Sequence, residues 1–247
     1  MNEVLLAAES VGYPEIKDLQ DLDSNNGFSR WLRTVSPEGR RQDSAHTFIH
    51  PLLQDGKHPN LHVLVEHQVV RVLFDNQKRA SAVEFVVSQF HQDVPPAAEQ
   101  LTQAVRARKV VVLSAGACGS PLILERSGVG NPDVLARAGV PIVANVPGVG
   151  YDYQDHNLIT TVYKTSLEPC ETADELFSGR ITTEQAIKEG NKMLGWNGTD
   201  VASKIRPKDS DIAAMGPEFQ AAWDRDFRNN PNKPLMFTGM FGGYVCF

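Results

Sequence analysis

The sequence of 247 residues predicts a mixed α/β fold, and three observations support this prediction. Alternating apolar residues in NLHVLVEHQVVRVLFD and ASAVEFVV predict an antiparallel meander. The run KVVVLSAG is apolar without alternation, which is typical of a strand buried on both faces of a parallel sheet. Helical periods return in the last third of the chain. Strands and helices therefore share the chain.

Composition narrows the classes of protein that this chain could represent. Hydrophobic residues make up 41% and charged residues 22%, as in an ordinary globular protein with a core. A net charge of -6 gives no basic surface for nucleic acid and disfavours anionic membranes. The three cysteines are far apart and form neither a disulfide framework nor a zinc spacing. With no secretory signal and no membrane span, we expect an intracellular protein without a nucleic-acid or membrane partner.

The first 55 residues are expected to form helices and loops. The segment EVLLAAESVG has helical spacing and ends at Gly12, and GFSRWLRTV is interpreted as another short piece of helix or loop. Ser44 is the expected N-cap of a further helix, which stops or bends near Pro51.

An antiparallel meander is expected next. Its strands are predicted at Leu61–Val65, Val69–Phe74 and 80–87, with a turn at Asp75–Lys78 between the last two. Residues 88–106 are polar, contain a Pro-Pro pair, and are expected to leave the sheet as a surface excursion.

The next unit is a strand, a turn of small residues and a helix. The predicted strand Val110–Ser114 ends in the small residues of SAGACGS, and Ser120 and Pro121 are the expected N-cap and first residue of a helix that ends at Gly128. A short helix ending at Gly139 follows, and a strand is predicted over 157–165.

The last part of the chain mixes helices with one strand. The segments TADELFSG, TTEQAIKEGNKMLG and PEFQAAWDRDF are predicted helices, and KPLMFTGMFGGYVCF is strand-like. An apolar, aromatic end of this kind leads us to expect a truncated domain.

The small residues after Ser114 suggest a binding function for the turn. At the carboxyl end of a strand, Ser, Ala and Gly let the backbone approach a ligand closely. The following helix directs free N–H groups and its positive dipole end to the same crevice, which suits a bulky, partly anionic cofactor. The alternative is that small residues only allow tight packing of strand and helix. The spacing is not the G-x-G-x-x-G of a phosphate loop.

The segment GACGSPLILERSGVG resembles the second signature of the glucose–methanol–choline (GMC) family of flavin-dependent oxidoreductases. The segments GRRQDSAHTFIHPLL, HPNLHVLVEHQVVRVLF, AGVPIVANVPGVGYDYQDH and KIRPK look like the alcohol (methanol) oxidase branch of that family. The resemblance implies a partial Rossmann-like FAD-binding domain with the meander, together with part of a substrate-binding domain. It implies domain boundaries at 1–55, 56–155 and 156–247.

The resemblance also implies FAD as the cofactor and assigns residues to it. Val69 matches the family's backbone contact to adenine, and the turn matches the segment beside the flavin and its ribityl–pyrophosphate chain. The loop GVGYDYQDH matches a family loop near the cofactor. The implied cofactor-binding residues are Val69, Ser114, Ala115, Gly116, Asp155 and His156. Cys118, in the turn, is interpreted as a small buried hydrophobic residue.

The implied reaction is oxidation of a short primary alcohol to an aldehyde, with oxygen as acceptor and peroxide as product. An FAD-dependent alcohol dehydrogenase with another acceptor, and a non-catalytic module that keeps the fold, are the alternatives. The family also implies a homo-oligomer for the full-length protein, in a peroxisomal or cytoplasmic location.

Two family motifs are not found in this sequence. No G-x-G-x-x-G precedes residue 40, and none of the seven histidines lies in the context of the family's catalytic histidine, so no catalytic residue is assigned. We therefore expect an internal fragment that is close to inactive by itself. A strand at Val110–Ser114 without its neighbours should also favour self-association.

His46 and His50 are four residues apart on an expected helix, so both could face one metal ion. No third ligand is evident, and no general base follows them as in H-E-x-x-H. We therefore expect no metal site.

Overall fold

The structure, a computed structural model, describes residues 2–88, 101–196 and 198–243. The chain divides into two compact units, which we call unit 1 (Met1–His58 with Thr161–Phe247) and unit 2 (Pro59–Thr160). Within the described ranges, no helix is both long and apolar enough to cross a membrane.

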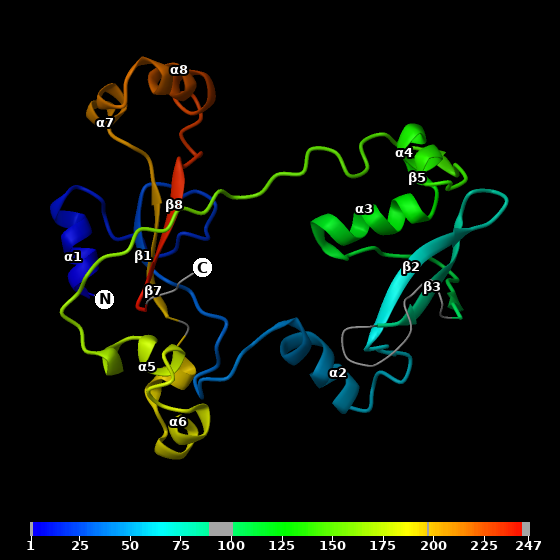
Figure 1. The fold of residues 1–247 in the computed structure, drawn as a ribbon, viewed down its shortest axis with the longest axis horizontal. Helices are drawn as coiled ribbons and strands as arrows, with labels where there is room; N and C mark the ends of the chain where they lie inside the picture. The colour runs from blue at the N-terminus through cyan, green and yellow to red at the C-terminus, as the bar shows by residue number, and fades with distance from the viewer. Residues whose placement is uncertain (1, 89–100, 197, 244–247) are drawn as a thin grey trace. The chain divides into compact units, whose positions relative to one another are not determined.

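Unit 1 carries most of the helices (Figure 1). Its elements are α1 (Asn2–Ser10), β1 (Gly27–Arg30), the π-helix η1 (Ala45–Ile49), α2 (His50–Gln54), the 3-10 helix η3 (Pro169–Glu171), α5 (Asp174–Phe177), α6 (Thr183–Glu189), the 3-10 helix η4 (Lys192–Gly195), β7 (Thr199–Ile205), α7 (Asp209–Ala214), α8 (Pro217–Asp226) and β8 (Met236–Phe241).

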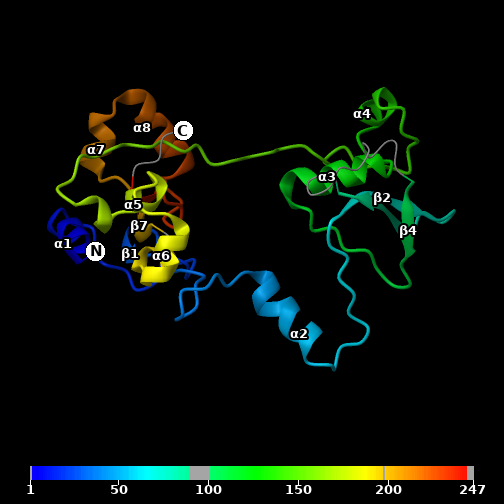
Figure 2. The ribbon, with the colours of Figure 1, turned by 60° about the horizontal axis from the view of Figure 1, so that its bottom comes forward.

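The sheet of unit 1 is antiparallel with the strand order β1-β7-β8. Its central strand β7 is the most buried, and the side chains of Val201 and Ser203 are almost completely covered. Helices α7 and α8 lie near one end of the strands, and α5 and α6 lie near the other (Figure 1, Figure 2). The segment 27–30, expected as helix or loop, is a strand because its backbone pairs with β7 from Lys204 to Val201. Tertiary pairing has overridden local preference here.

Unit 2 consists of a three-stranded antiparallel sheet, a two-stranded parallel sheet of β5 and β6, and two helices. Its elements are β2 (His67–Phe74), β3 (Ala80–Val87), β4 (Gln103–Arg106), α3 (Gly116–Arg126), β5 (Val129–Gly130), α4 (Pro132–Arg137) and β6 (Ala144–Asn145). The strand order is β2-β3-β4, so the predicted hairpin of β2 and β3 is confirmed. The core lies between this sheet and the helices, and includes Val72, Val86, Ile123 and Leu135.

The surface excursion expected for 88–106 is wrong for its last residues. Residues 103–106 form β4, because their backbone pairs with Ala82–Phe85 of β3. Residues 89–100 of that excursion lie outside the described ranges.

Three predicted strands are not strands in the structure: Leu61–Val65, Val110–Ser114 and 157–165. A strand requires a neighbour for its N–H and C=O groups, and no described segment pairs with these three. The expectation that Val110–Ser114 is buried on both faces is also wrong, since Val110 is 71% and Val112 76% exposed.

Two predicted helix starts also need correction. Helix α3 begins at Gly116 rather than after Ser120, and the Ala115 N–H donates to Ser120 Oγ at 3.0 Å. The serine therefore reaches back to the helix start from inside the first turns. Ser44 makes no capping bond, and the acceptor is Asp43, whose Oδ1 receives the His46 N–H at 3.0 Å.

Two further helices show how side-chain caps and glycines set their boundaries. Helix α4 begins after Asn131, whose Oδ1 accepts the Asp133 N–H at 2.9 Å, and Gly139 follows its end with φ of 66°. Helix α6 begins after Thr182 and ends at Gly190, which has φ of 62°, so the helix predicted over TTEQAIKEGNKMLG is interrupted there and only a 3-10 turn follows. These positions use a side-chain N-cap and a left-handed glycine stop, and Gly139 is the stop that the sequence predicts.

Candidate functional site

The turn at residues 114–118 lies in unit 2 and is open. Ser114, Ala115, Gly116 and Cys118 are all exposed, so the expectation that Cys118 is buried is wrong. Gly116 has φ of 81°, and a Cβ placed on it would meet no atom within 4 Å. The glycine is therefore required by backbone conformation, and the space beside it is free among the described residues.

The start of α3 has the electrostatics of an anion site. The first N–H groups of a helix have no partners within the helix, and the helix dipole is positive at this end. No acidic residue lies in the first turn of α3, and Arg126 lies in its last turn. Pro121 lies inside the helix and has no N–H to offer the Ala117 carbonyl. This arrangement presents backbone donors, without competing carboxylates, beside the open turn.

Helix α3 is fixed to the outer edge of β2 by Ser127. The Val72 N–H donates to Ser127 Oγ at 2.8 Å, and the Ser127 hydroxyl donates to the Ile123 carbonyl at 2.5 Å. Both hydrogen bonds are buried. Sequence reasoning did not single out Ser127. Its signal is a serine next to Gly128, where the helix was expected to end.

Val69 lies on β2, the edge strand of the sheet, and pairs with Phe85 of β3. A register shift follows directly, between Val69 and Arg71. No described strand lies on the outer side of β2, so its outer backbone edge is free of sheet pairing there. An edge strand is the setting that a backbone contact to a planar base requires.

The loop that carries Asp155 and His156 begins against α3. A Cβ on Gly150 would lie 3.6 Å from Glu125 Oε1 and 3.9 Å from Pro121 Cβ, so this turn rests on the helix. Further along, the His156 N–H donates to Asp155 Oδ1 at 2.7 Å, and both side chains are exposed.

The structure therefore gathers only part of the predicted set. Ser114, Ala115 and Gly116 form one open turn at the start of α3, and Val69 lies on the strand to which α3 is fixed. Within the described ranges, no hydrogen bond or ion pair joins Asp155 or His156 to that turn.

His46 and His50, singled out for their spacing, lie in unit 1 with ring centroids 5.0 Å apart. The Nδ1 atom of His46 is 2.7 Å from Asp43 Oδ1. Among the residues that the structure describes, no group of three His, Cys, Asp or Glu side chains is placed to hold a metal ion.

The residues of the open turn at 114–118 fit the requirements of a bound FAD. A flavin dinucleotide needs bare main chain, room for its tether and donors for its pyrophosphate. The free space at Gly116, the exposed residues around it and the start of α3 provide these features. No described side chain closes the turn at Gly116.

Comparison with known proteins decides the family. The sequence profile of the GMC oxidoreductase family matches residues 1–158. The chain belongs to the GMC oxidoreductase family. The family and the mixed α/β fold that the sequence predicts are thus confirmed.

Two curated relatives and one solved structure resemble this GMC oxidoreductase along most of its length. An alcohol oxidase of Candida boidinii is 34% identical over 248 residues, which is 98% of this chain and 36% of that protein. An oxygen-dependent choline dehydrogenase of Pseudomonas putida is 39% identical over 214 residues, which is 87% of this chain and 34% of that protein. The chain thus spans about a third of the length of these relatives.

The solved structure is an FAD-dependent oxidoreductase from Chaetomium thermophilum. Its TM-score to this chain is 0.69 at 21% identity, over 98% of this chain and 45% of that one. This likeness shows the fold. FAD is the cofactor that the name of this structure and the sequence-based expectation share.

Proposed function

We propose that this protein is an FAD-dependent oxidoreductase that oxidises a short primary alcohol to an aldehyde, with oxygen as acceptor and hydrogen peroxide as product. The open turn at Gly116, at the start of α3, carries the cofactor part of the proposal. The similarity to an alcohol oxidase along 98% of the chain supports the alcohol as substrate.

The described residues would hold the cofactor rather than perform the chemistry. Bound FAD supplies the acceptor for hydride from the alcohol carbon. The backbone of Ser114, Ala115 and Gly116 would lie against the flavin tether, and the backbone of Val69 would pair with the adenine edge. Asp155 and His156 would orient the site from their loop. We assign no general base to any of the seven histidines of the chain.

The proposal assigns cofactor binding and substrate binding to different units. Unit 2 contains all six proposed cofactor residues, so it would supply part of the FAD-binding domain. Unit 1 contains residues 161–247, which are most of the segment (156–247) that the sequence assigns to the substrate-binding domain. We propose a homo-oligomer in a peroxisome or the cytoplasm for the protein as a whole.

A second candidate is a dehydrogenase that acts on a larger, cationic alcohol. The 39% identity to an oxygen-dependent choline dehydrogenase favours it. Peroxide release and dye reduction by the full-length protein, each measured with methanol and with choline, separate the two candidates. Peroxide formed from methanol supports the oxidase. Dye reduction with choline and none with methanol supports the dehydrogenase.

The cofactor proposal is tested by filling the open turn. Ala115→Leu places a branched side chain at an exposed residue beside Gly116, where it should displace the flavin but not disturb packing. Ala136→Leu, at an exposed residue of α4, is the matched control. We expect Ala115→Leu to lower the bound flavin per chain at least tenfold, read from flavin absorbance after gel filtration. Equal flavin content in the two variants would contradict the proposal.

A further inference from the structure

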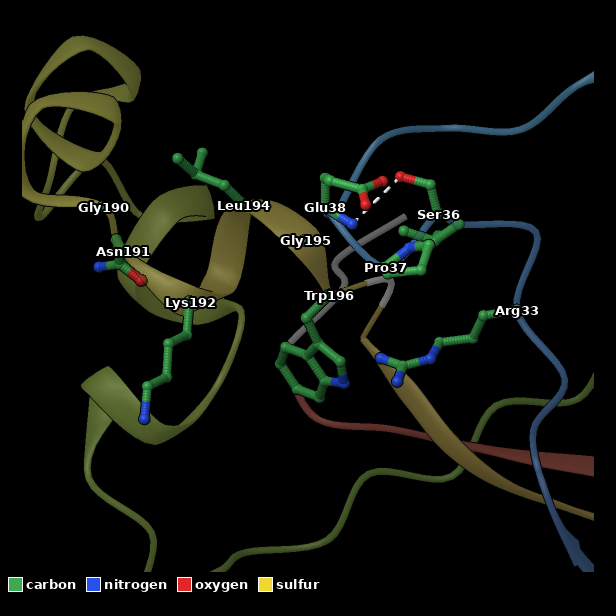
Figure 3. A pocket seen from close by; sticks show the side chains of 12 residues that line it. Arg33, Ser36, Pro37, Glu38, Gly190, Asn191, Lys192, Leu194, Gly195 and Trp196 are labelled. Carbon is green, nitrogen blue, oxygen red and sulfur yellow. Dashed lines mark hydrogen bonds between the residues drawn. The ribbon is translucent and has the colours of Figure 1, made fainter. Parts of the chain in front are cut away.

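Unit 1 contains a pocket of about 730 Å³ between the loop at 33–39 and the segment at 190–196 (Figure 3). Its volume lies in the range of small-molecule sites in proteins. Two cationic side chains, Arg33 and Lys192, line it from opposite walls, together with the indole of Trp196. None of these three residues belongs to the proposed flavin site in unit 2.

Charge in the pocket favours an anion. Arg33 and Lys192 are both exposed, and the ion pairs of the described residues include neither of them. Glu38 also lines the pocket. The Ser36 hydroxyl is the main cause that lowers the pKa of Glu38, so this carboxylate stays ionised at neutral pH. The pocket therefore keeps one net positive charge, and a ligand with a single negative charge matches it.

Trp196 gives the pocket a fixed, flat apolar wall. Its Nε1–H donates to Asp200 Oδ1 at 2.9 Å. Its ring packs on Gly242, where an added Cβ would lie 2.6 Å from the ring carbon Cη2. In Figure 3 the indole lies between the side chains of Lys192 and Arg33. A ring held in this way loses little conformational freedom when a ligand stacks on it.

The two walls of the pocket touch through a pair of glycines. A Cβ on either Gly39 or Gly195 would lie 3.2 Å from the Cα of the other. The Gly39 N–H donates to the Ser36 carbonyl at 2.9 Å, and the Leu194 N–H donates to the Asn191 carbonyl at 3.2 Å. Both walls are thus tight turns that meet backbone to backbone, so the pocket is formed before any ligand enters.

We propose that this pocket binds a small aromatic carboxylate, with its negative charge matched by Arg33 and Lys192 and its ring against the indole of Trp196. A planar guanidinium matches a carboxylate, the lysine adds a second positive charge, and the indole offers a face for stacking. A neutral alcohol requires neither cation, so the ligand of this pocket differs from the proposed alcohol substrate.

The test uses 4-fluorobenzoate as the ligand, observed by fluorine NMR with the purified chain. Its neutral analogue 4-fluorobenzamide keeps the ring and removes the charge, and we expect it to bind at least tenfold more weakly. Arg33→Gln and Lys192→Gln should each weaken benzoate binding at least tenfold. Arg180→Gln and Lys188→Gln, which remove exposed cations outside the pocket, are the matched controls and should leave it unchanged.

Three results would overturn the proposal. These are no binding of the benzoate, equal binding of benzoate and benzamide, and equal loss of binding in the pocket and control variants. Because Arg33 and Lys192 are exposed, their replacement should leave the fold intact, and far-UV circular dichroism of each variant checks this.

Discussion

At the scale of single residues, Ser127 provides the hydrogen bond that joins α3 to the edge of β2. Ser127→Ala would leave the buried Val72 N–H without its acceptor, and an unsatisfied buried donor costs about 1–3 kcal/mol. We expect the free energy of unfolding, measured by urea titration, to fall by that amount. Ser210→Ala, at an exposed residue of α7, is the control and should change it by less than about 0.5 kcal/mol. Equal stability of the two variants would show that another group satisfies Val72.

A fold can require glycine for its left-handed backbone conformation or for lack of space beside it, and Gly128 and Gly139 distinguish the two reasons. It has φ of 82°, and a Cβ on it would lie 2.3 Å from the Pro141 carbonyl oxygen. Gly139 has φ of 66° but no atom within 4 Å of such a Cβ. Gly139→Ala should therefore cost only the left-handed conformation, about 1–2 kcal/mol. Gly128→Ala should cost about 1–3 kcal/mol more, because Pro141 must also move. Urea unfolding of both variants checks this, and equal losses would contradict it.

At the scale of elements, the start of the η1–α2 helical segment depends on an ionised carboxylate. Hydrogen bonds from the His46 backbone and ring, in that order, lower the pKa of Asp43 from 3.8 to about 2. Because the pKa is lower in the folded state, this stabilisation is present above pH 3.8 and is lost as the pH falls toward 2.

NMR titration of the Asp43 carboxyl carbon should therefore give a midpoint near pH 2, and the His46 amide resonance should move with it. Asp43→Asn keeps an oxygen acceptor but does not ionise, so the His46 amide should lose this pH dependence. A midpoint near the ordinary value of 3.8 would refute the assignment.

The sequence predicted those elements whose signals are local. The hairpin of β2 and β3 and helix α4 carry their own turn or cap residues, such as Asn131 and Gly139. The end of α6 at Gly190 was not predicted, because the helical pattern continues to Gly195. Segments that depend on a distant partner were assigned wrongly. Residues 27–30 became a strand through pairing with β7, and Val110–Ser114 did not become one because no described strand lies beside it.

The same distinction applies to the sites. The open turn at Gly116 is formed by consecutive small residues, so the sequence alone indicates it. The pocket of Arg33, Lys192 and Trp196 joins segments more than 150 residues apart in the chain, and neither segment carries a motif. The contact of Gly39 with Gly195, together with the pairing of β1 and β7, brings these groups together.

At the scale of the whole molecule, the exposed apolar residues of unit 2 have a consequence for solution behaviour. Val110 and Val112 are 71% and 76% exposed on a segment without strand pairing, and Ile159 is 85% exposed. Unpaired backbone beside apolar side chains favours association with a second chain. We therefore expect light scattering to give a mass well above the 27.2 kDa of one chain.

A charge on this segment should reverse the association if the segment causes it. Val112→Lys adds a positive charge at the middle of the apolar run, where each copy would repel the next. Ile187→Lys makes the same change at a residue of α6 that is 65% exposed, away from the run in sequence. We expect Val112→Lys to shift the scattering mass toward one chain and Ile187→Lys to leave it high. A monodisperse monomer for the unaltered chain would refute the prediction, and so would an equal shift in both variants, because general repulsion between charged chains would then explain the change.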